Sequence, residues 1–281
     1  MLSTVLKQNN RIKIGMFILA IFLIMGGILP LLSPYDPRSW NVVPRNLPPS
    51  GQHLFGTNNL GQDTFWLLTS AIRNSLIIGL IVASLATIIG VMAGLTAGFL
   101  GGIADRVLTL IMDVFIVVPS LPILILMASL LQGRSSQLLI SLVLVLFNWP
   151  WPARQVRSLA LSMREREFIN TARFSGSSTF TILVREILPY IFAWSLANFV
   201  NTVLVAIATE SGLAVIGLSS VEEITLGGMI YWALQHQALL GARWWWIGSP
   251  VVAIILLFVG LFLLATGVTQ SSSERRGHQY A

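Results

Sequence analysis

Two carboxylates in apolar surroundings are the residues of this chain best suited to chemistry. Asp113 lies inside a long apolar run, and Glu210 lies at the end of another. An ionised carboxylate is costly within a membrane, so each is a candidate for a transport path or gate. The alternative for Asp113 is an ion pair with Arg106 or a hydrogen bond near the membrane surface. For Glu210 the alternative is a carboxylate at the membrane interface.

Catalytic and metal-binding sets are not apparent in the sequence. The histidines His53, His236 and His278 are far apart, and the chain has no cysteine, so no spaced ligand set is present. No Ser/His/Asp or Cys/His arrangement stands out. The phosphate-binding pattern Gly-x-x-x-x-Gly-Lys-Ser/Thr is missing too, so the chain has no ATP site of that kind. We therefore expect no catalytic residue, no cofactor and no metal in this chain.

Composition indicates a membrane protein. Of 281 residues, 55% are hydrophobic and 10% are charged, and the mean hydropathy is +0.79. Soluble domains carry about a quarter charged residues, and so apolar a chain does not stay disordered in water. The net charge of +6 comes from short basic clusters between uncharged runs. That pattern is typical of membrane proteins and argues against nucleic-acid binding.

The elements that must position Asp113 and Glu210 are membrane-spanning helices of about 20 residues each. The sequence predicts six of them, at residues 14–32, 76–99, 106–131, 135–153, 187–209 and 244–267. We therefore expect an all-α, polytopic membrane domain over 14–268. If both ends are cytoplasmic, 12 of the 17 basic residues lie inside. This excess predicts a cytoplasmic N-terminus, 1–13, and a cytoplasmic, loosely ordered tail, 269–281.

Three connections are long: an outside loop at 33–72, an inside loop at 154–186 and an outside segment at 210–246. Pro150 and Pro152 are expected to end the fourth helix. The Trp244–Trp246 cluster indicates a membrane interface, although an aromatic surface for sugar rings is the alternative.

The inside loop shows helical periodicity, with Ile169, Ala172 and Gly176 on one face. Gly176 is the expected helix stop, and Ser177 or Ser178 would cap a second helix. That second helix is expected to end before Pro189. Such an element either rests on anionic lipid through its arginines or presents a small apolar face to a cytoplasmic partner. The pattern leaves both open.

This loop resembles the cytoplasmic motif of bacterial ABC-importer permeases. The motif has a Glu, two alanines four and five residues later, a Gly at position nine and a later Leu-Pro. The matching residues are Glu167, Ala172, Gly176, Leu188 and Pro189. Thr171 stands where the family has the first alanine.

Two more blocks resemble the subfamily that imports dipeptides, oligopeptides and nickel. Residues 53–63 resemble its Leu-Gly-Thr-Asp-x-x-Gly-Arg-Asp block, with Phe55 for Leu, Asn58 for Asp and Gln62 for Arg. Residues 210–218 resemble its Glu-Ala-Gly-Leu-Ser-Phe-Leu-Gly-Leu block. The stretch 33–37 resembles the start of the outside loop in the second permease subunit of these systems. With three blocks in order, the chain looks like such a permease along nearly its whole length.

The resemblance implies a division of labour among subunits. The chain would be one of two related permeases in a bacterial or archaeal inner membrane, surrounded by lipid. Two separate ATPase subunits would bind ATP and magnesium, and an extracytoplasmic binding protein would deliver the cargo. Peptides are the expected cargo, and oligosaccharides or nickel chelates are alternatives. A self-sufficient ion-coupled carrier and a docking protein without transport are less favoured alternatives.

Residues 167–176 would form a coupling helix on the cytoplasmic side. The residues implied in coupling to the ATPase are Glu167, Phe168, Thr171, Ala172, Gly176, Leu188 and Pro189. Those that we assign to the translocation path or gate are Asp113, Glu210, Gly212 and Gly217.

Overall fold

The computed structural model describes residues 10–130, 137–218 and 223–279, and this part of the chain is mostly helical. Its elements are α2 Asn10–Gly27, a 3₁₀ turn η1 Leu29–Leu32, α3 Thr64–Leu100, α4 Gly102–Val117, α5 Ser120–Leu130, α6 Gln137–Asn148, α7 Pro150–Arg164, α8 Glu167–Phe174, α9 Thr179–Thr181, a π-helical turn η2 Ile182–Ile187, α10 Leu188–Val215, α11 Leu226–Gln235 and α12 Trp244–Gln279. Within the described ranges no strand occurs beyond one isolated bridge. The all-α prediction is confirmed.

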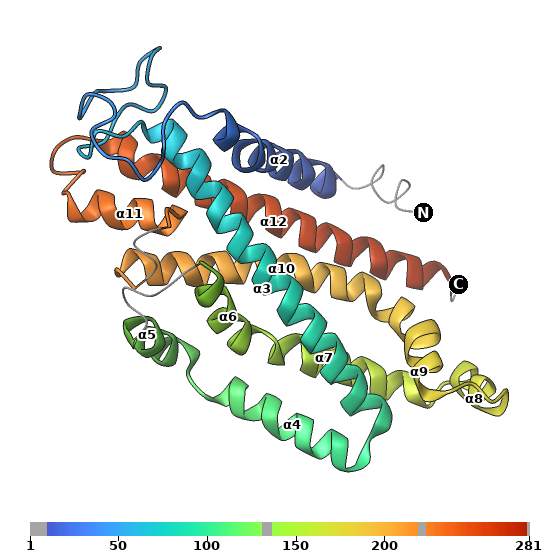
Figure 1. Cartoon of the computed structure of the whole chain (residues 1–281). Helices are drawn as coiled ribbons and strands as arrows, with labels where there is room; N and C mark the ends of the chain where they lie inside the picture. The colour runs from blue at the N-terminus through green and yellow to red at the C-terminus, as the bar shows by residue number, and fades with distance from the viewer. Residues whose placement is uncertain (1–9, 131–136, 219–222, 280–281) are drawn as a thin grey trace.

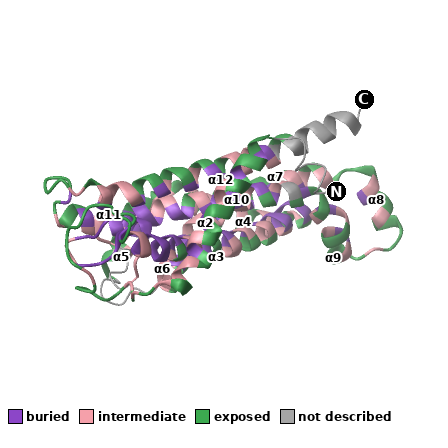
Figure 2. Cartoon of the chain, turned by 90° about the horizontal axis from the view of Figure 1, so that it is seen from above, coloured by how far each residue is buried: buried purple, intermediate pink, exposed green. Residues whose placement is uncertain are grey.

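The long helices lie side by side in an elongated bundle with two different ends (Figure 1). At one end lie the start of α2, the end of α12 and the short helix α8. At the opposite end lie α11 and the loop 33–63 (Figures 1 and 2). The first and last described helices thus meet the same end of the bundle, as an even number of crossings requires.

Among the described residues, four helical stretches are long and apolar enough to cross a membrane: Asn10–Leu32, Thr64–Leu100, Trp194–Val215 and Trp244–Val268. A fifth crossing arises if α4 and α5 count as one broken span. The predicted fourth span, 135–153, corresponds to α6 and the start of α7. With 12 residues, α6 is about 18 Å long, which is short of a bilayer core. The polytopic architecture is therefore established, and the count of six stays a prediction.

The third span is not the continuous helix that we expected. Gly102–Val117 and Ser120–Met127 are bent by 79° relative to each other. The break falls at Val118, whose backbone is extended with ψ 126°. Pro119 follows, and a proline disfavours helical geometry in the residue before it.

The helix α3 begins well before the predicted residue 76. The Asp63 side chain accepts hydrogen bonds from the backbone N–H groups of Phe65 and Trp66 and so caps the helix at Thr64. The outside loop therefore ends at Asp63 and not at 72. Arg73 interrupts the apolar run but lies within the helix, because a long basic side chain can extend to the membrane surface from inside a helix.

Prolines begin a helix where we expected one to end. The preceding helix does stop at Asn148, but Pro150 then starts α7, which occupies the first third of the expected inside loop. Proline suits the first turn because its missing N–H would be unpaired there anyway. The polar tail is a further correction: α12 continues to Gln279, since no proline follows Pro250 to stop it.

Close backbone contact joins α3 to α7. A Cβ added at Gly94 would lie 2.8 Å from the Val156 Cβ, and one at Gly98 would lie 2.6 Å from the Arg157 carbonyl oxygen. Together with Gly90, these glycines form a stripe at a spacing of four residues. Small residues at that spacing let two helices approach closely in a membrane. The pair α3–α7 is therefore packed backbone to backbone.

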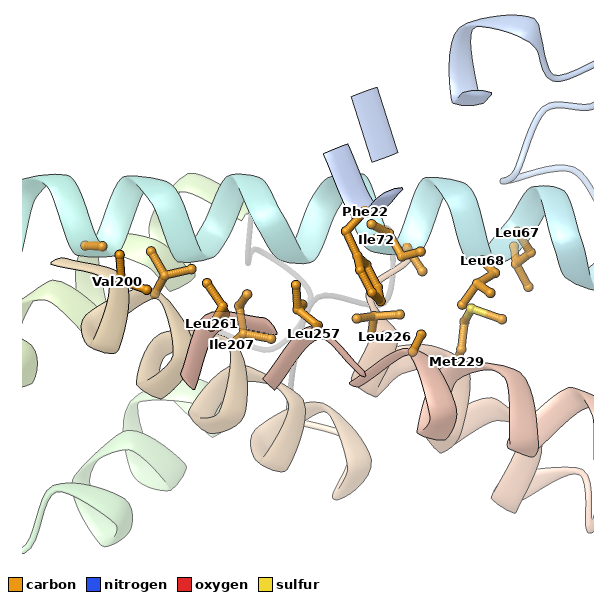
Figure 3. Packing of buried hydrophobic residues seen from close by; sticks show 14 residues of the cluster. Phe22, Leu67, Leu68, Ile72, Val200, Ile207, Leu226, Met229, Leu257 and Leu261 are labelled. Carbon is orange, nitrogen blue, oxygen red and sulfur yellow. The ribbon is translucent and has the colours of Figure 1, made fainter. Parts of the chain in front are cut away.

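The main core lies between α2, α3, α10, α11 and α12. It contains Phe22, Ile72, Ile207, Leu226 and Leu257, one from each of these helices, and all are buried. Figure 3 shows these side chains meeting in the space between the ribbons. Many large apolar side chains are instead exposed, and exposed residues lie along the outside of the bundle (Figure 2). An apolar exterior is what a protein in contact with lipid presents.

Candidate functional site

The inside loop folds into α8, which is anchored to the bundle by one face. Ile169 is fully buried, and Ala172 packs against the same apolar cluster as Ile182 and Ile187. The Phe168 ring stacks on Tyr190, with 5.4 Å between centroids and 17° between planes. The predicted short helix is confirmed, and its apolar face is turned toward the bundle.

Gly176 ends this element in the way that its sequence predicts. Its φ is +76°, its N–H donates to the Arg173 carbonyl at 3.0 Å, and the Ser177 N–H donates to the Ala172 carbonyl at 3.1 Å. These two bonds form a Schellman motif, which favours glycine at the left-handed position. Ser178 then caps α9 by accepting a hydrogen bond from the Thr181 N–H at 3.2 Å.

The outward face of the loop carries an unexpected apolar side chain. Phe174, the last residue of α8, is 93% exposed, and Phe180 is 75% exposed. Glu167 and Thr171 are exposed beside them. Neither phenylalanine was singled out from the sequence, because the helical period assigns apolar residues to the buried face. The sequence signal that could have identified them is their position next to the turn, where the helical periodicity of the loop is interrupted.

The second helix was predicted to end before Pro189, and this prediction is wrong: the helix does not end at Leu188 and Pro189. The chain passes from α9 through the π-helical turn η2 directly into α10, with the Leu188 N–H bonded to the Leu183 carbonyl five residues back. Proline has no N–H to donate and crowds the carbonyl four residues before it. A wider turn relieves that crowding. The pair is thus a joint between the loop and α10.

Asp113 makes an ion pair, though not with Arg106. Its Oδ1 lies 3.3 Å from Nη1 of Arg154, and both side chains are about half exposed. About two turns nearer the start of α4, Asp105 accepts a hydrogen bond from Arg157 at 2.8 Å. Both pairs join α4 to α7. Half-exposed ion pairs contribute about 0–1 kcal/mol, so this one serves to align two helices.

Glu210 is fully buried inside α10, which continues to Val215, past the predicted end at 209. Its Oε1 accepts a hydrogen bond from the Thr225 hydroxyl at 2.8 Å. The same hydroxyl caps α11 by accepting from the Gly228 N–H at 3.1 Å. The backbone N–H of Leu226 donates to Ser75 on α3. Glu210 therefore fixes the start of α11 against the neighbouring helices.

The structure separates the glycines that the sequence grouped with Glu210. Gly217, with φ +80°, ends α10 in a second Schellman motif, and a Cβ there would lie 2.9 Å from the Tyr231 ring. Gly212 is exposed, and a Cβ there would meet nothing within 4 Å. Glu210 and Gly217 thus meet α11, Gly212 does not, and Asp113 lies on α4 against α7.

The block at residues 53–63 forms a compact cap on α3 through buried polar contacts. The His53 ring nitrogen Nδ1 lies 2.7 Å from Oδ2 of Asp63. The Asn58 amide donates to the Gln62 side-chain oxygen at 2.9 Å, and the Gln62 amide donates to the Pro37 carbonyl at 2.8 Å. Two of the three residues that depart from the family block, Asn58 and Gln62, are therefore each other's partners. The sequence alone did not show this.

Comparison with known proteins identifies the family. Residues 87–277 match the model described as "binding-protein-dependent transport system inner membrane component". The chain belongs to this family of transport permeases. Residues 4–49 also match the model of the N-terminal transmembrane domain of oligopeptide transport permease C. The ABC-importer permease expected from the three sequence blocks is confirmed.

Two curated relatives align with nearly the whole permease. It is 31% identical to the dipeptide transport system permease protein DppC of Bacillus subtilis, over 94% of this chain and 81% of the relative. It is 30% identical to the oligopeptide transport system permease protein OppC of Mycobacterium tuberculosis H37Rv, over 96% of this chain and 94% of the relative.

A solved structure of the MetNI methionine ABC transporter, in an inward-facing conformation, has the same fold. Its TM-score is 0.57 at 18% identity, with 74% of this permease and 96% of that chain covered. Its membership of the binding-protein-dependent transport family makes the permease an integral inner-membrane component of a transporter that also uses an ATPase and a substrate-binding protein.

Proposed function

We propose that this permease is the second of two related permease subunits in an importer of short peptides. Two ATPase subunits would hold ATP and magnesium, and a binding protein would deliver the peptide from outside. This chain would itself hold no cofactor and catalyse no reaction. The observation that carries the proposal is the match of residues 4–49 to the N-terminal domain of oligopeptide permease C. The near full-length similarity to dipeptide and oligopeptide permeases supports it.

The cytoplasmic side in this proposal is the end of the bundle that carries α8. That end receives most of the arginines, which favour the cytoplasm. The chain ends, 1–13 and 269–281, would then be cytoplasmic, and the loop 33–63 and α11 would face outside. Exposed Phe174 would insert into a groove of the ATPase subunit, as an apolar helix residue does in many protein contacts.

The coupling path in this proposal consists of directly connected elements. A push on α8 is transmitted to the bundle through Ile169 and the Phe168–Tyr190 stack. It also passes through the π-helical turn into α10, whose 28 residues span about 42 Å. At the far end of α10, Glu210 holds α11. Movement of the ATPase subunits would therefore reach the outer gate along a single helix.

Cysteine crosslinking tests the docking step, because the chain has no native cysteine to interfere. We expect Phe174→Cys to crosslink to an engineered cysteine in the ATPase groove. Ala172 is half-buried in the apolar cluster and is a poorer position. Leu54→Cys is the matched control, since Leu54 is also exposed but lies in the outer loop. Crosslinking of Leu54→Cys but not Phe174→Cys would reverse the proposed orientation.

Two substitutions of Gly176 separate docking from folding. Either side chain strains the left-handed backbone by about 1–2 kcal/mol, and a Cβ at this position meets nothing within 4 Å. Only Gly176→Trp adds bulk on the docking face. We expect peptide uptake to survive in Gly176→Ala and to be lost in Gly176→Trp, with both inserted normally. Full uptake by Gly176→Trp would contradict the coupling assignment. Loss of uptake in Asp113→Asn alone would favour an ion-coupled carrier.

A further inference from the structure

A cavity of about 370 Å³ lies at the end of the bundle opposite α8. Its walls come from the outer loop, the ends of α3 and α10, and the helices α11 and α12. The side chains that define its chemistry are Arg38, Trp40, Glu223, Tyr231, Trp232 and Trp246. A volume of this size accommodates a small ligand or one large side chain.

Aromatic rings form one part of the wall. Trp232 makes edge-to-face contacts with Trp40, at 6.4 Å between centroids, and with Tyr231, at 5.5 Å. These rings come from the outer loop and from α11, so two segments that are far apart in the sequence form this part of the cavity wall. Aromatic faces favour another ring or a large apolar group in this geometry.

Trp246 supplies a hydrogen-bond donor that the described part of the chain leaves without an acceptor. The residue is fully buried, it lines the cavity, and its indole N–H has no partner among the described residues. Buried donors are nearly always paired. Because no part of Trp246 is exposed to the cavity, a ligand oxygen does not reach this N–H, and the ring contributes to the wall through its apolar surroundings alone.

Opposite charges stand at the edge of the same cavity. The Arg38 guanidinium lies 3.0 Å from a carboxylate oxygen of Glu223, and the Arg38 side chain is 65% exposed. Such an exposed pair is weak and can exchange its partners for those of a ligand. A molecule with one positive and one negative end is complementary to both residues.

We propose that this cavity is an outer binding site for the cargo peptide, a step before it enters the path between the two permeases. A large apolar or aromatic side chain of the peptide lies among the rings. The charged termini of the peptide meet Glu223 and Arg38 at the edge of the cavity. The inference rests on the proposed peptide cargo and adds a site and a side-chain preference to it.

The test uses the full permease, purified in lipid nanodiscs with the subunits that copurify and without binding protein. Radiolabelled Phe-Ala is the probe, and equilibrium dialysis measures its dissociation constant. We expect Trp40→Ala to weaken binding about 5- to 10-fold and Trp40→Phe to recover most of it. Gly-Gly, which lacks the side chain, should bind at least about 10-fold more weakly than Phe-Ala.

A matched control guards against a general effect of losing an exposed tryptophan. Trp40 is 58% exposed and Trp151, on α7, is 59% exposed. Trp151→Ala should leave Phe-Ala binding unchanged. Equal binding by Trp40→Ala and wild type, or equal losses in Trp40→Ala and Trp151→Ala, would overturn the proposal.

Two other results would also overturn it. Maltose binding that depends on Trp40 in place of peptide binding would make this a sugar site. Unchanged peptide binding with weakened binding-protein affinity in Trp40→Ala would make it a protein-docking surface. Cellular uptake of Phe-Ala distinguishes the two levels of the argument. If cells take up the peptide but its binding does not depend on Trp40, the outer-site proposal alone is wrong. If cells take up no peptide at all, the proposed peptide cargo is wrong.

Discussion

The substitutions Asn58→Asp and Gln62→Arg should each lower the stability of the permease when made singly. Made together, they should leave its stability close to that of wild type. In the outer loop the Asn58 side-chain oxygen accepts from the backbone N–H groups of Leu60, at 3.0 Å, and Gln62, at 2.9 Å. Its amide donates to the Gln62 side-chain oxygen. Every polar atom of the Asn58 side chain is therefore assigned to a partner, and none of this side chain is exposed.

Asn58→Asp replaces the donating amide by an oxygen that faces the Gln62 oxygen. Turning the Gln62 amide around would direct its oxygen at the carbonyls of Pro37 and Ser39, to which its nitrogen now donates. Two acceptors face each other in either arrangement. A buried group without its hydrogen bond costs about 1–3 kcal/mol. A guanidinium at 62 donates in all of these directions, so the double variant restores every bond.

The apparent melting temperature of the purified permease measures this effect. A loss of about 2 kcal/mol lowers the midpoint by about 4–8 °C in a chain of this size. Each single variant should show such a loss, and the double variant should lie within about 2 °C of wild type. The coupling in the double-mutant cycle would then be about 4 kcal/mol, the sum of the two single losses.

Additive losses in the double variant would refute this reasoning, because they would mean that the two side chains act independently. An unchanged Asn58→Asp would refute it as well, since the buried carboxylate would then have a partner that the structure does not show.

Two further predictions concern packing and pH. Gly94→Val should lower the apparent melting temperature by several degrees, because its Cβ would overlap α7. Gly212→Ala, on α10 with open space around it, should leave the melting temperature unchanged or raise it slightly, because alanine favours a helix over glycine. An equal loss in both variants would contradict the assigned packing. Burial and the nearby Arg243 lower the pKa of His236, so the unfolded chain binds the proton more readily. Stability should therefore fall as the pH drops below about 6.5. His236→Phe should flatten melting profiles between pH 5 and 7.5, and an unchanged slope would contradict this.

Much of the fold was predictable because long apolar runs and helix-ending residues act locally. Gly176 is one example: its place after a short periodic segment predicted a helix stop, and its φ of +76° agrees. Pro119 is the counterexample, since the hydropathy of 106–131 concealed a break that this one residue produces. Arg73 shows that charge marks the limit of an apolar run and not the limit of a helix.

The candidate site was less predictable because its contacts join residues far apart in sequence. Glu210 was assigned to the translocation path or gate, with a carboxylate at the membrane interface as the alternative, and the sequence carried no local signal for its buried contact with Thr225. The pairing of Asp113 with Arg154 likewise depends on how α4 lies against α7. Phe174 was overlooked because exposure at a helix end depends on the turn that follows it.

The length of α3 gives the permease a mechanical property. With 37 residues it is about 55 Å long, whereas the hydrocarbon core is about 30 Å thick. One end carries the outer cap through Asp63, and the other is held to α7 by the glycine stripe at 90, 94 and 98. The helix is thus longer than the hydrocarbon core is thick, and it connects the cap at residues 53–63 to α7 as one continuous element. Tilting it by about 5° around its centre moves each end by about 2 Å in opposite directions.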